Sequence, residues 1–203
     1  LELSIDKMLE FVDDDTNLII LANPNSPIGD YKTIDEIKPL LDTGIPVLID
    51  EAYIEFLDTE DIYWDSFIKH IDDYPNLLVT RTFSKGFGAA GCRVGMTFAH
   101  KDTIEPLSKF RQMYEITGVS LKYCEFLLDN HHLVDIYCQE VVDEKKKVVS
   151  MLKNYEVVDS NCNWIHFNNQ EDNKRTKEIL EKHKVLVKYC KLHPYGFRDN
   201  WCR

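Results

Sequence analysis

Residues 17–50 read NLIILANPNSPIGDYKTIDEIKPLLDTGIPVLID, and this stretch decides the fold. The apolar run at 17–22 predicts a buried strand, which a polar loop rich in Pro and Gly follows. Thr33 is a typical N-cap residue and predicts a helix that runs to about residue 41. The apolar run at 45–49 predicts the next strand. A strand, a helix and a second strand in this order form a βαβ unit of a parallel sheet.

The rest of the chain continues the alternation and then changes character. Further strands are predicted at 76–81 and 94–99, and two long helices between 104 and 153, broken near Gly118 and near 130–132. The charged run DEKKK at 143–147 is interpreted as one solvated helix face. Later elements are strands at 155–158, 163–167 and 185–189 and a helix at 173–183. We therefore predict an α/β protein with two domains, a large mostly parallel-sheet domain with a connecting helix at 1–128 and a small α+β domain at 129–203.

Composition limits the classes of protein that fit. The 203 residues are 44% hydrophobic and 29% charged, as in ordinary globular domains. The formal net charge of −11 argues against nucleic acid or an anionic membrane surface as the main partner, since both select basic faces. The sequence has neither an apolar run of the roughly 20 residues that a membrane span needs nor a signal-peptide pattern at its start.

The cysteines and histidines give no metal or disulfide pattern. The six cysteines include no CxxC pair, which in a chain of this length indicates free thiols in a reducing compartment. Histidines at 131, 132, 166 and 193 fit no standard zinc spacing. We expect a cytoplasmic protein without a metal site.

Residues 82–88 read TFSKGFG and place Lys85 in a glycine-rich turn, with Arg93 eight residues further on. A lysine amine can bond covalently to the aldehyde of pyridoxal 5′-phosphate (PLP), while hydroxyls and a guanidinium can bind its phosphate. Most lysines in such loops are ordinary surface residues. This segment alone leaves both interpretations open.

Two further loops converge on the same edge of the predicted sheet. Asp50 follows the strand at 45–49, where ligands bind in parallel α/β sheets. Its carboxylate could hold a protonated pyridine nitrogen, or it could cap the next turn. Tyr53 could bind the hydroxyl of a cofactor ring or pack in the core. The loop NPNSPIG at 23–29 follows the first strand, and the shared location favours a cofactor site.

Three of these segments carry a family resemblance. Residues 50–56 (DEAYIEF), 81–85 (RTFSK) and 91–96 (GCRVGM) resemble the signature loops of fold-type I PLP-dependent aminotransferases, most closely the histidinol-phosphate aminotransferase branch. The resemblance spans the whole chain. It implies the PLP-dependent transferase fold of type I, PLP as the cofactor, small-molecule amino acid and 2-oxo acid substrates, and a homodimer.

The resemblance also implies roles for single residues. Lys85 would be the Schiff-base lysine, Asp50 the partner of the pyridine nitrogen, and Tyr53 a contact of the ring hydroxyl. The residues that would bind the cofactor phosphate are Thr82, Ser84 and Arg93, with the arginine supplying a bidentate fork. Arg203 matches the arginine that clamps the substrate carboxylate in this family.

The chain departs from the family pattern in three places. Ser26 stands where the family has an asparagine that meets the ring hydroxyl, so Asn25 would take this contact. Lys188 stands where histidinol-phosphate enzymes carry an arginine for the substrate phosphate, which keeps the charge and loses the planar fork. The family's N-terminal part, with a phosphate-binding glycine loop and much of the dimer contact, does not match any segment.

The sequence therefore predicts a PLP-dependent aminotransferase that moves an amino group between an amino acid or amino-phosphate substrate and a 2-oxo acid. Two alternatives stay open. One is a PLP-dependent decarboxylase of the threonine-phosphate type, which resembles the same branch. The other is an aminotransferase-fold binding module without catalysis, against which the joint presence of Lys85, Asp50 and Arg93 speaks.

Overall fold

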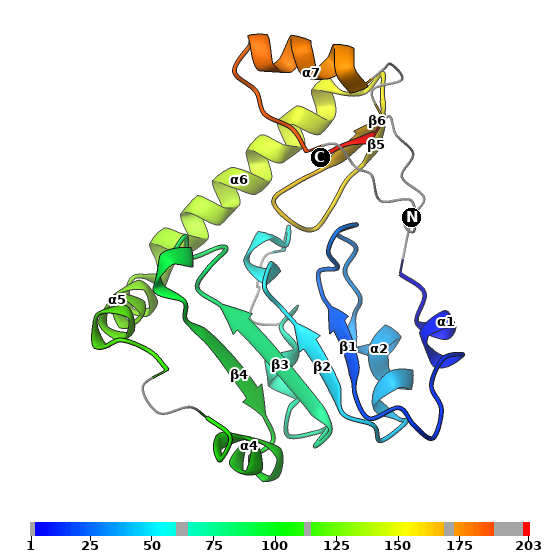
Figure 1. Ribbon diagram of the computed structural model, residues 1–203, viewed down its shortest axis with the longest axis vertical. Coiled ribbons are helices and arrows are strands. Elements are labelled where there is room, and N and C mark those ends of the chain that lie inside the picture. Colours follow the sequence, from blue (N-terminus) through cyan, green and yellow to red (C-terminus); the bar gives the residue numbers. More distant parts are fainter. Residues whose placement is uncertain (1–2, 60–64, 112–114, 169–172, 189–200) are drawn as a thin grey trace.

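A four-stranded sheet forms the larger part of the molecule in the computed structural model, which describes residues 3–59, 65–111, 115–168, 173–188 and 201–203 (Figure 1). Its strands β1 (Ile19–Ala22), β2 (Val47–Asp50), β3 (Leu77–Thr82) and β4 (Gly95–Ala99) lie in sequence order. The first three are parallel, and β4 runs antiparallel to β3. The predicted α/β class with a mostly parallel sheet is confirmed.

The helix between β1 and β2 begins where its sequence predicts. Helix α2 (Ile34–Leu41) starts after Thr33, whose hydroxyl accepts from the Glu36 amide while the Glu36 carboxylate accepts from the Thr33 amide. This capping box satisfies two amides that the first turn leaves without helical partners. A short helix that the sequence analysis missed, α1 (Ile5–Leu9), contacts α2.

The two faces of the large sheet differ in their cover. Six side chains on one face are buried against α1, α2 and the turn η2 (Phe67–His70), namely Ile19, Leu21, Val47, Ile49, Leu77 and Val79. The other face is open at the β1 side, where Leu18 is 45% and Ile20 is 62% exposed. Both faces of parallel sheets are normally covered, so this open face is a surface on which a further layer can pack.

Three helices follow the sheet. They are α4 (Lys101–Ser108), α5 (Gly118–Asp129) and α6 (His131–Met151), with boundaries at the two predicted breaks. The charged run at 143–147 is not wholly solvated, which corrects the prediction. The Lys145 side chain is only 10% exposed, because its ammonium donates to the carbonyls of Ser160 and Cys162 and lies 3.6 Å from the Asp159 carboxylate.

A second, smaller sheet follows α6. Its strands β5 (Glu156–Val158), β6 (His166–Asn168) and β7 (Trp201–Cys202) are antiparallel in that order, and α7 (Asn173–Lys182) lies between β6 and β7 in sequence. The predicted strand at 185–189 is wrong for the described residues 185–188, and Tyr189 lies outside the described part. Strand β6 pairs with β7, and among residues 185–188 Lys188 alone exchanges backbone hydrogen bonds with Arg203. The division into domains at residues 128 and 129 stays a prediction.

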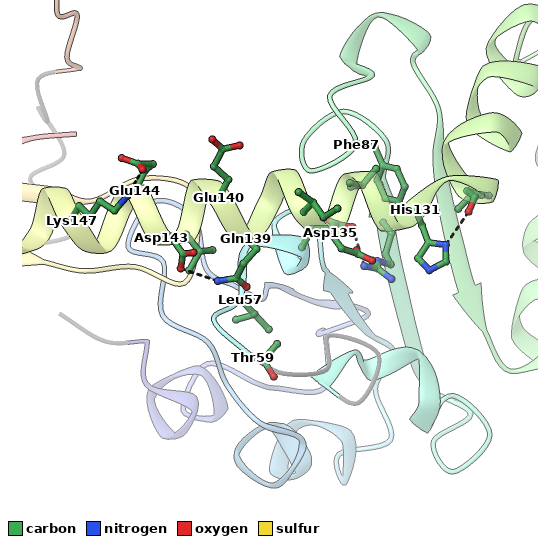
Figure 2. A pocket seen from close by; sticks show the side chains of 16 residues that line it. Leu57, Thr59, Phe87, His131, Asp135, Gln139, Glu140, Asp143, Glu144 and Lys147 are labelled. Carbon is green, nitrogen blue, oxygen red and sulfur yellow. Dashed lines mark hydrogen bonds and ion pairs between the residues drawn. The ribbon is translucent and has the colours of Figure 1, made fainter.

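A cavity of about 950 Å³ lies between α6 and the segment after β2 (Figure 2). Leu57 and Thr59 line one side, and Asp135, Gln139 and Asp143 of α6 line the other. Neither Lys85 nor Asp50 is among its lining residues. The predicted site therefore lies elsewhere, at the strand ends.

Candidate active site

The predicted site residues follow the carboxyl ends of β1, β2 and β3, which point toward the small sheet (Figure 1). Asp50 is the last residue of β2, and Thr82 is the last residue of β3. Gly95 opens β4 opposite Thr82, so the antiparallel direction of β4 brings Arg93, two residues earlier, to this same edge. A parallel β4 would have placed Arg93 at the opposite edge.

Asp50 is half-buried and its carboxylate is held in place. Its Oδ1 accepts from the Ala52 amide at 3.2 Å and from the Thr80 hydroxyl at 3.3 Å. Thr80 is the register partner of Asp50 on β3, so the contact comes from the pairing of the strands. The carboxylate thus caps the turn that follows β2, and its two hydrogen bonds fix its direction at the strand end.

The turn that carries Lys85 is closed by its own backbone. The Gly88 amide donates to the Lys85 carbonyl at 2.9 Å, and the Ala89 amide donates to the Phe83 carbonyl at 2.8 Å. The Lys85 side chain is exposed, and its Nζ lies 5.1 Å from the centre of the Tyr53 ring. Because Tyr53 follows Asp50 by three residues, this contact joins two of the predicted loops.

The residues predicted to bind a phosphate surround the same turn. The Thr82 hydroxyl accepts from the Ser84 amide at 3.1 Å and donates to the Val94 carbonyl at 3.4 Å. Arg93 is exposed and has the left-handed φ of 55°, and its Nη1 donates to the Ala90 carbonyl at 3.2 Å. Two hydroxyls and one guanidinium therefore lie within the connection between β3 and β4.

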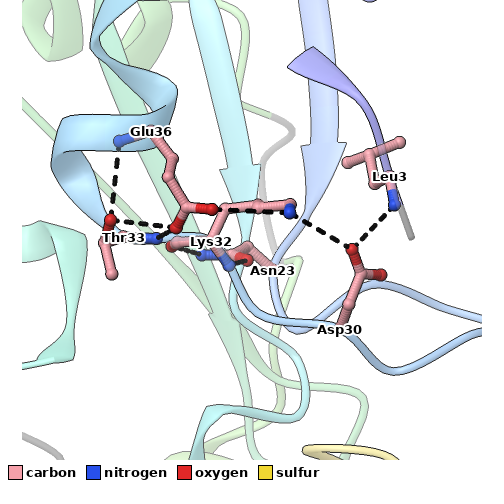
Figure 3. Close-up of polar contacts among 6 residues, drawn as sticks. All are labelled: Leu3, Asn23, Asp30, Lys32, Thr33 and Glu36. Carbon is pink, nitrogen blue, oxygen red and sulfur yellow. Dashed lines mark hydrogen bonds and ion pairs between the residues drawn. The ribbon is translucent and has the colours of Figure 1, made fainter.

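The loop after β1 is anchored by a buried asparagine (Figure 3). The Asn23 amide group donates to the Lys32 carbonyl and its oxygen accepts from the Lys32 amide, both at 2.8 Å. Lys32 in turn lies 3.9 Å from the Asp30 carboxylate and 3.4 Å from that of Glu36. Asn25 is half-buried within this loop, and its backbone amide donates to the Asp30 carbonyl at 2.7 Å.

Trp164 belongs to the site although the sequence analysis did not select it. Its ring lies 4.7 Å from the Tyr53 ring at 89°, and its Nε1 donates to the Pro27 carbonyl at 3.0 Å. The Arg203 guanidinium carbon lies 4.9 Å from its ring centre. The residue precedes β6 by two positions, and no local pattern shows that it contacts two loops more than 100 residues earlier.

Lys188 and Arg203 are the two predicted substrate residues. In the described residues, the Arg203 side chain contacts Trp164. Lys188 and Arg203 exchange backbone hydrogen bonds of 2.8 Å in both directions. The Lys188 side chain is exposed. Its backbone is therefore paired with that of Arg203, while a contact of its ammonium with a substrate stays a prediction.

A buried ionic cluster lies next to the turn that carries Lys85, and the sequence analysis did not predict it. Arg81 Nη2 donates to Glu55 Oε1 at 2.9 Å, and Arg81 Nε lies 3.8 Å from Glu51 Oε2. Glu51 also accepts from the Ser66 hydroxyl at 2.8 Å and the Phe67 amide at 2.6 Å. Burial raises the pKa of Glu55 to about 7 and also raises the pKa of Glu51, although the Arg81 charge opposes both shifts.

Glu55 connects this cluster to the lysine turn. A Cβ atom at position 86 would lie 2.6 Å from the Glu55 Cβ, so only glycine fits beside Lys85. From α6, the Cys138 thiol reaches the Gly86 carbonyl at 3.7 Å. Two other elements of the fold therefore contact the peptide that follows Lys85.

Histidines, cysteines and the longest helices of the described residues complete the description of the chain. Within these residues, no three or more metal-ligating side chains gather, and no helix is long and apolar enough to cross a membrane. His193 lies outside the described part of the chain. Five cysteines of the described part carry free thiols.

Known structures share this fold. The L-threonine-O-3-phosphate decarboxylase of Porphyromonas gingivalis matches with a TM-score of 0.78 at 19% identity, over 96% of this chain and 61% of that one. The histidinol-phosphate aminotransferase of Sinorhizobium meliloti, solved in complex with pyridoxal-5′-phosphate, matches with a TM-score of 0.75 at 19% identity, over 94% and 53%. The fold is therefore that of the fold-type I PLP-dependent transferases.

The family follows from the sequence comparisons. The family model for aminotransferases of class I and II matches residues 1–203, and the chain belongs to that family. The histidinol-phosphate aminotransferase 1 of Idiomarina loihiensis is 36% identical over 164 residues, which are 79% of this chain and 43% of that protein. The chain spans about half the length of the curated relatives it matches.

Proposed function

We propose that this chain belongs to a PLP-dependent aminotransferase, which moves an amino group between a histidinol-phosphate-like amino acid or amino-phosphate substrate and a 2-oxo acid. The observation that carries the proposal is the position of the Lys85 ammonium over the Tyr53 ring, beside the strand end that carries Asp50. The names of the relatives support the substrate class.

The side chains at this edge suit PLP in their chemistry. The cofactor has an aldehyde, a ring nitrogen, a ring hydroxyl and a phosphate, and the edge offers an amine, a carboxylate, a phenol, hydroxyls and a guanidinium. When bound, PLP supplies an electron sink for the carbanion that forms at the substrate Cα. The amine for the aldehyde is Lys85, and Asp50 would hold the protonated ring nitrogen.

The other site residues take the roles that their positions allow. Tyr53 and Asn25 would face the ring hydroxyl. Thr82, Ser84 and Arg93 would hold the phosphate, where the guanidinium can form two parallel hydrogen bonds.

The substrate side lies near the small sheet. Arg203 would bind the substrate carboxylate, and Lys188 would bind a substrate phosphate. Lys85, once released from the cofactor, would carry the proton that leaves the substrate Cα.

The proposal extends to assembly and location. A homodimer is expected from the family resemblance, and a cytoplasmic location is expected from the free thiols. Sedimentation of the full-length protein tests the dimer.

The direct test is to locate the covalent bond between protein and cofactor. The full-length protein is loaded with PLP, reduced with borohydride and digested, and the peptides are weighed. We expect the cofactor mass on the peptide that contains Lys85. Lys85→Ala should abolish the label, whereas Lys101→Ala, which removes a lysine at the exposed start of α4, should keep it. A label retained in Lys85→Ala would remove Lys85 from the mechanism.

The second candidate is a PLP-dependent decarboxylase, which the match to the P. gingivalis structure favours. The two activities differ in their co-substrate, since amino transfer requires a 2-oxo acid and decarboxylation releases carbon dioxide without one. Assaying both products with the same amino substrates separates them. A protein that gives neither product, although Lys85 is labelled, would favour the non-catalytic binding module.

A further inference from the structure

Four side chains form one continuous row across the site. The Lys85 ammonium lies 5.1 Å from the Tyr53 ring centre, the Tyr53 and Trp164 rings are 4.7 Å apart and perpendicular, and the Arg203 guanidinium lies 4.9 Å from the Trp164 ring centre. Cations are attracted to the faces of aromatic rings, and perpendicular aromatic pairs are favourable. The row therefore connects the lysine turn of the large sheet to the last strand of the small sheet.

Trp164 is the fixed member of this row. Its indole Nε1 donates to the Pro27 carbonyl at 3.0 Å, which ties the ring to the loop after β1. The Ser160 hydroxyl donates to the backbone carbonyl of Trp164. The segment that precedes it is held by Lys145 of α6, whose ammonium donates to the Cys162 carbonyl at 3.1 Å. The loop after β1 thus holds the indole itself, and α6 holds the backbone that carries it, before any ligand binds.

Arg203 depends on the indole for its direction. In the described part of the chain no carboxylate forms an ion pair with its guanidinium, whose carbon lies 4.9 Å from the centre of the Trp164 ring. An arginine side chain has many rotamers, and a ligand that binds it must select one. Stacking on a fixed ring makes that selection in advance and leaves the N–H groups of the guanidinium available to an anion.

We propose that Trp164 is a positioning residue that sets the distance between the carboxylate-binding guanidinium of Arg203 and the reactive amine of Lys85. The inference rests on the proposed function, in which Arg203 binds the substrate carboxylate. A fixed distance selects acids whose amino or oxo group is on the carbon next to the carboxylate. Trp164 acts through Arg203 and need not touch the substrate.

The test measures binding of glutarate, a carboxylate with neither an amino nor an oxo group, to the full-length PLP-loaded protein by calorimetry. Irreversibly unfolded protein lowers the binding stoichiometry in calorimetry and leaves the dissociation constant unchanged, and a reversible equilibrium would weaken binding tenfold only if about nine tenths of the protein were unfolded, which circular dichroism of each variant excludes. We expect Trp164→Leu to weaken binding about tenfold and Trp164→Phe, which keeps an aromatic face, to stay within about threefold of the parent. Equal dissociation constants for the Leu and Phe variants would overturn the proposal.

A double-mutant cycle separates positioning from a general structural role. Because Trp164 acts through Arg203, Trp164→Leu should have no further effect on glutarate binding in an Arg203→Met background. Full additivity of the two changes would contradict the inference. Steady-state kinetics should agree, with Trp164→Leu raising the KM for the 2-oxo acid about tenfold while kcat changes less than about twofold.

Glutarate binding by the single variants distinguishes a failure of the proposed function from a failure of this inference alone. If Arg203→Met alone leaves glutarate binding unchanged, Arg203 is not the carboxylate clamp, and its role in the proposed function fails together with the inference. If Arg203→Met weakens binding and Trp164→Leu does not, the proposed function stands and the inference alone fails.

Discussion

The two sheets hold the two halves of the candidate site in different ways. The large sheet places Asp50 at the end of β2 and Lys85 shortly after the end of β3, and the side chains of Val47, Ile49 and Val79 on the covered face of these strands are fully buried. The small sheet has strands of only two or three residues, and its buried Trp201 packs on Ile28 of the large part. The part of the site at the large sheet, the proposed cofactor half, is thus fixed by a core of its own, whereas the part at the small sheet, the proposed substrate half, is fixed by contacts with the first.

The largest expected effect comes from the support of the cofactor half. Arg81→Met should lower the free energy of unfolding by about 3–5 kcal/mol, because it leaves Glu51 and Glu55 buried without their cation. Urea unfolding of the full-length protein measures the change. Arg111→Met removes an exposed ion pair with Glu115 and should cost less than about 1 kcal/mol. Equal losses for the two variants would show that the buried cluster does not stabilise this half.

The second effect is a dependence of stability on pH. Burial raises the pKa of Glu55 from 4.5 to about 7, so the folded state holds this proton more tightly than the unfolded chain. The resulting stability is fully present below pH 4.5 and is lost as the pH rises through about 7. Glu55→Gln lacks this loss, and its stability relative to the parent should rise by about 3 kcal/mol over that range.

The control for this titration is Glu140→Gln, which changes an exposed carboxylate on α6. Thermal melts at pH 4.5, 6 and 7.5 should show a pH-independent difference between this variant and the parent. A pH-independent difference for Glu55→Gln as well would refute the assigned direction of its pKa shift.

The third effect concerns the lysine turn itself. Gly86→Ala should destabilise the protein by about 2 kcal/mol, because the new methyl group would meet the Glu55 side chain at 2.6 Å. It should also weaken PLP binding, since the displaced turn carries Lys85. Gly91→Ala, where no atom lies within 4 Å of the added Cβ, should change neither quantity appreciably. Unfolding curves and cofactor titrations distinguish the two variants.

The smallest effect is expected in the substrate half. Lys145→Met should lower stability by about 1.5 kcal/mol, because the carbonyls of Ser160 and Cys162 lose a charged donor. Lys147→Met is the matched control, since its exposed ammonium pairs only with Glu144 in the described part of the chain. Lys145→Met should weaken glutarate binding without reducing the labelling of Lys85. Reduced labelling would mean that the two halves are not held separately.

The same contrast explains what the sequence could predict. The four strands of the large sheet, α2 with its Thr33 cap and the positions of the loops around Asp50 and Lys85 follow from local patterns, and the structure places these elements as expected. Predicting their positions requires only the hydrophobic periodicity of each segment and the geometry of a parallel sheet. The roles of these residues stay predictions until the cofactor is located on the protein.

Features that depend on distant pairing could not be predicted in this way. The direction of β4, the pairing of β7 with β6 and the position of Trp164 each depend on a partner far along the chain. The burial of Lys145 within a charged run depends on carbonyl groups that approach from another segment. Charge and hydropathy patterns describe one segment at a time and contain no information on such partners.

Helix α6 touches both halves of the site. It has 21 residues and, at 1.5 Å per residue, is about 30 Å long. In the first half of the helix the Cys138 thiol contacts the Gly86 carbonyl, and two turns further on Lys145 holds the segment before Trp164. A tilt of this rod would therefore act on both sheets at once, through the peptide that follows Lys85 and through the segment that precedes Trp164.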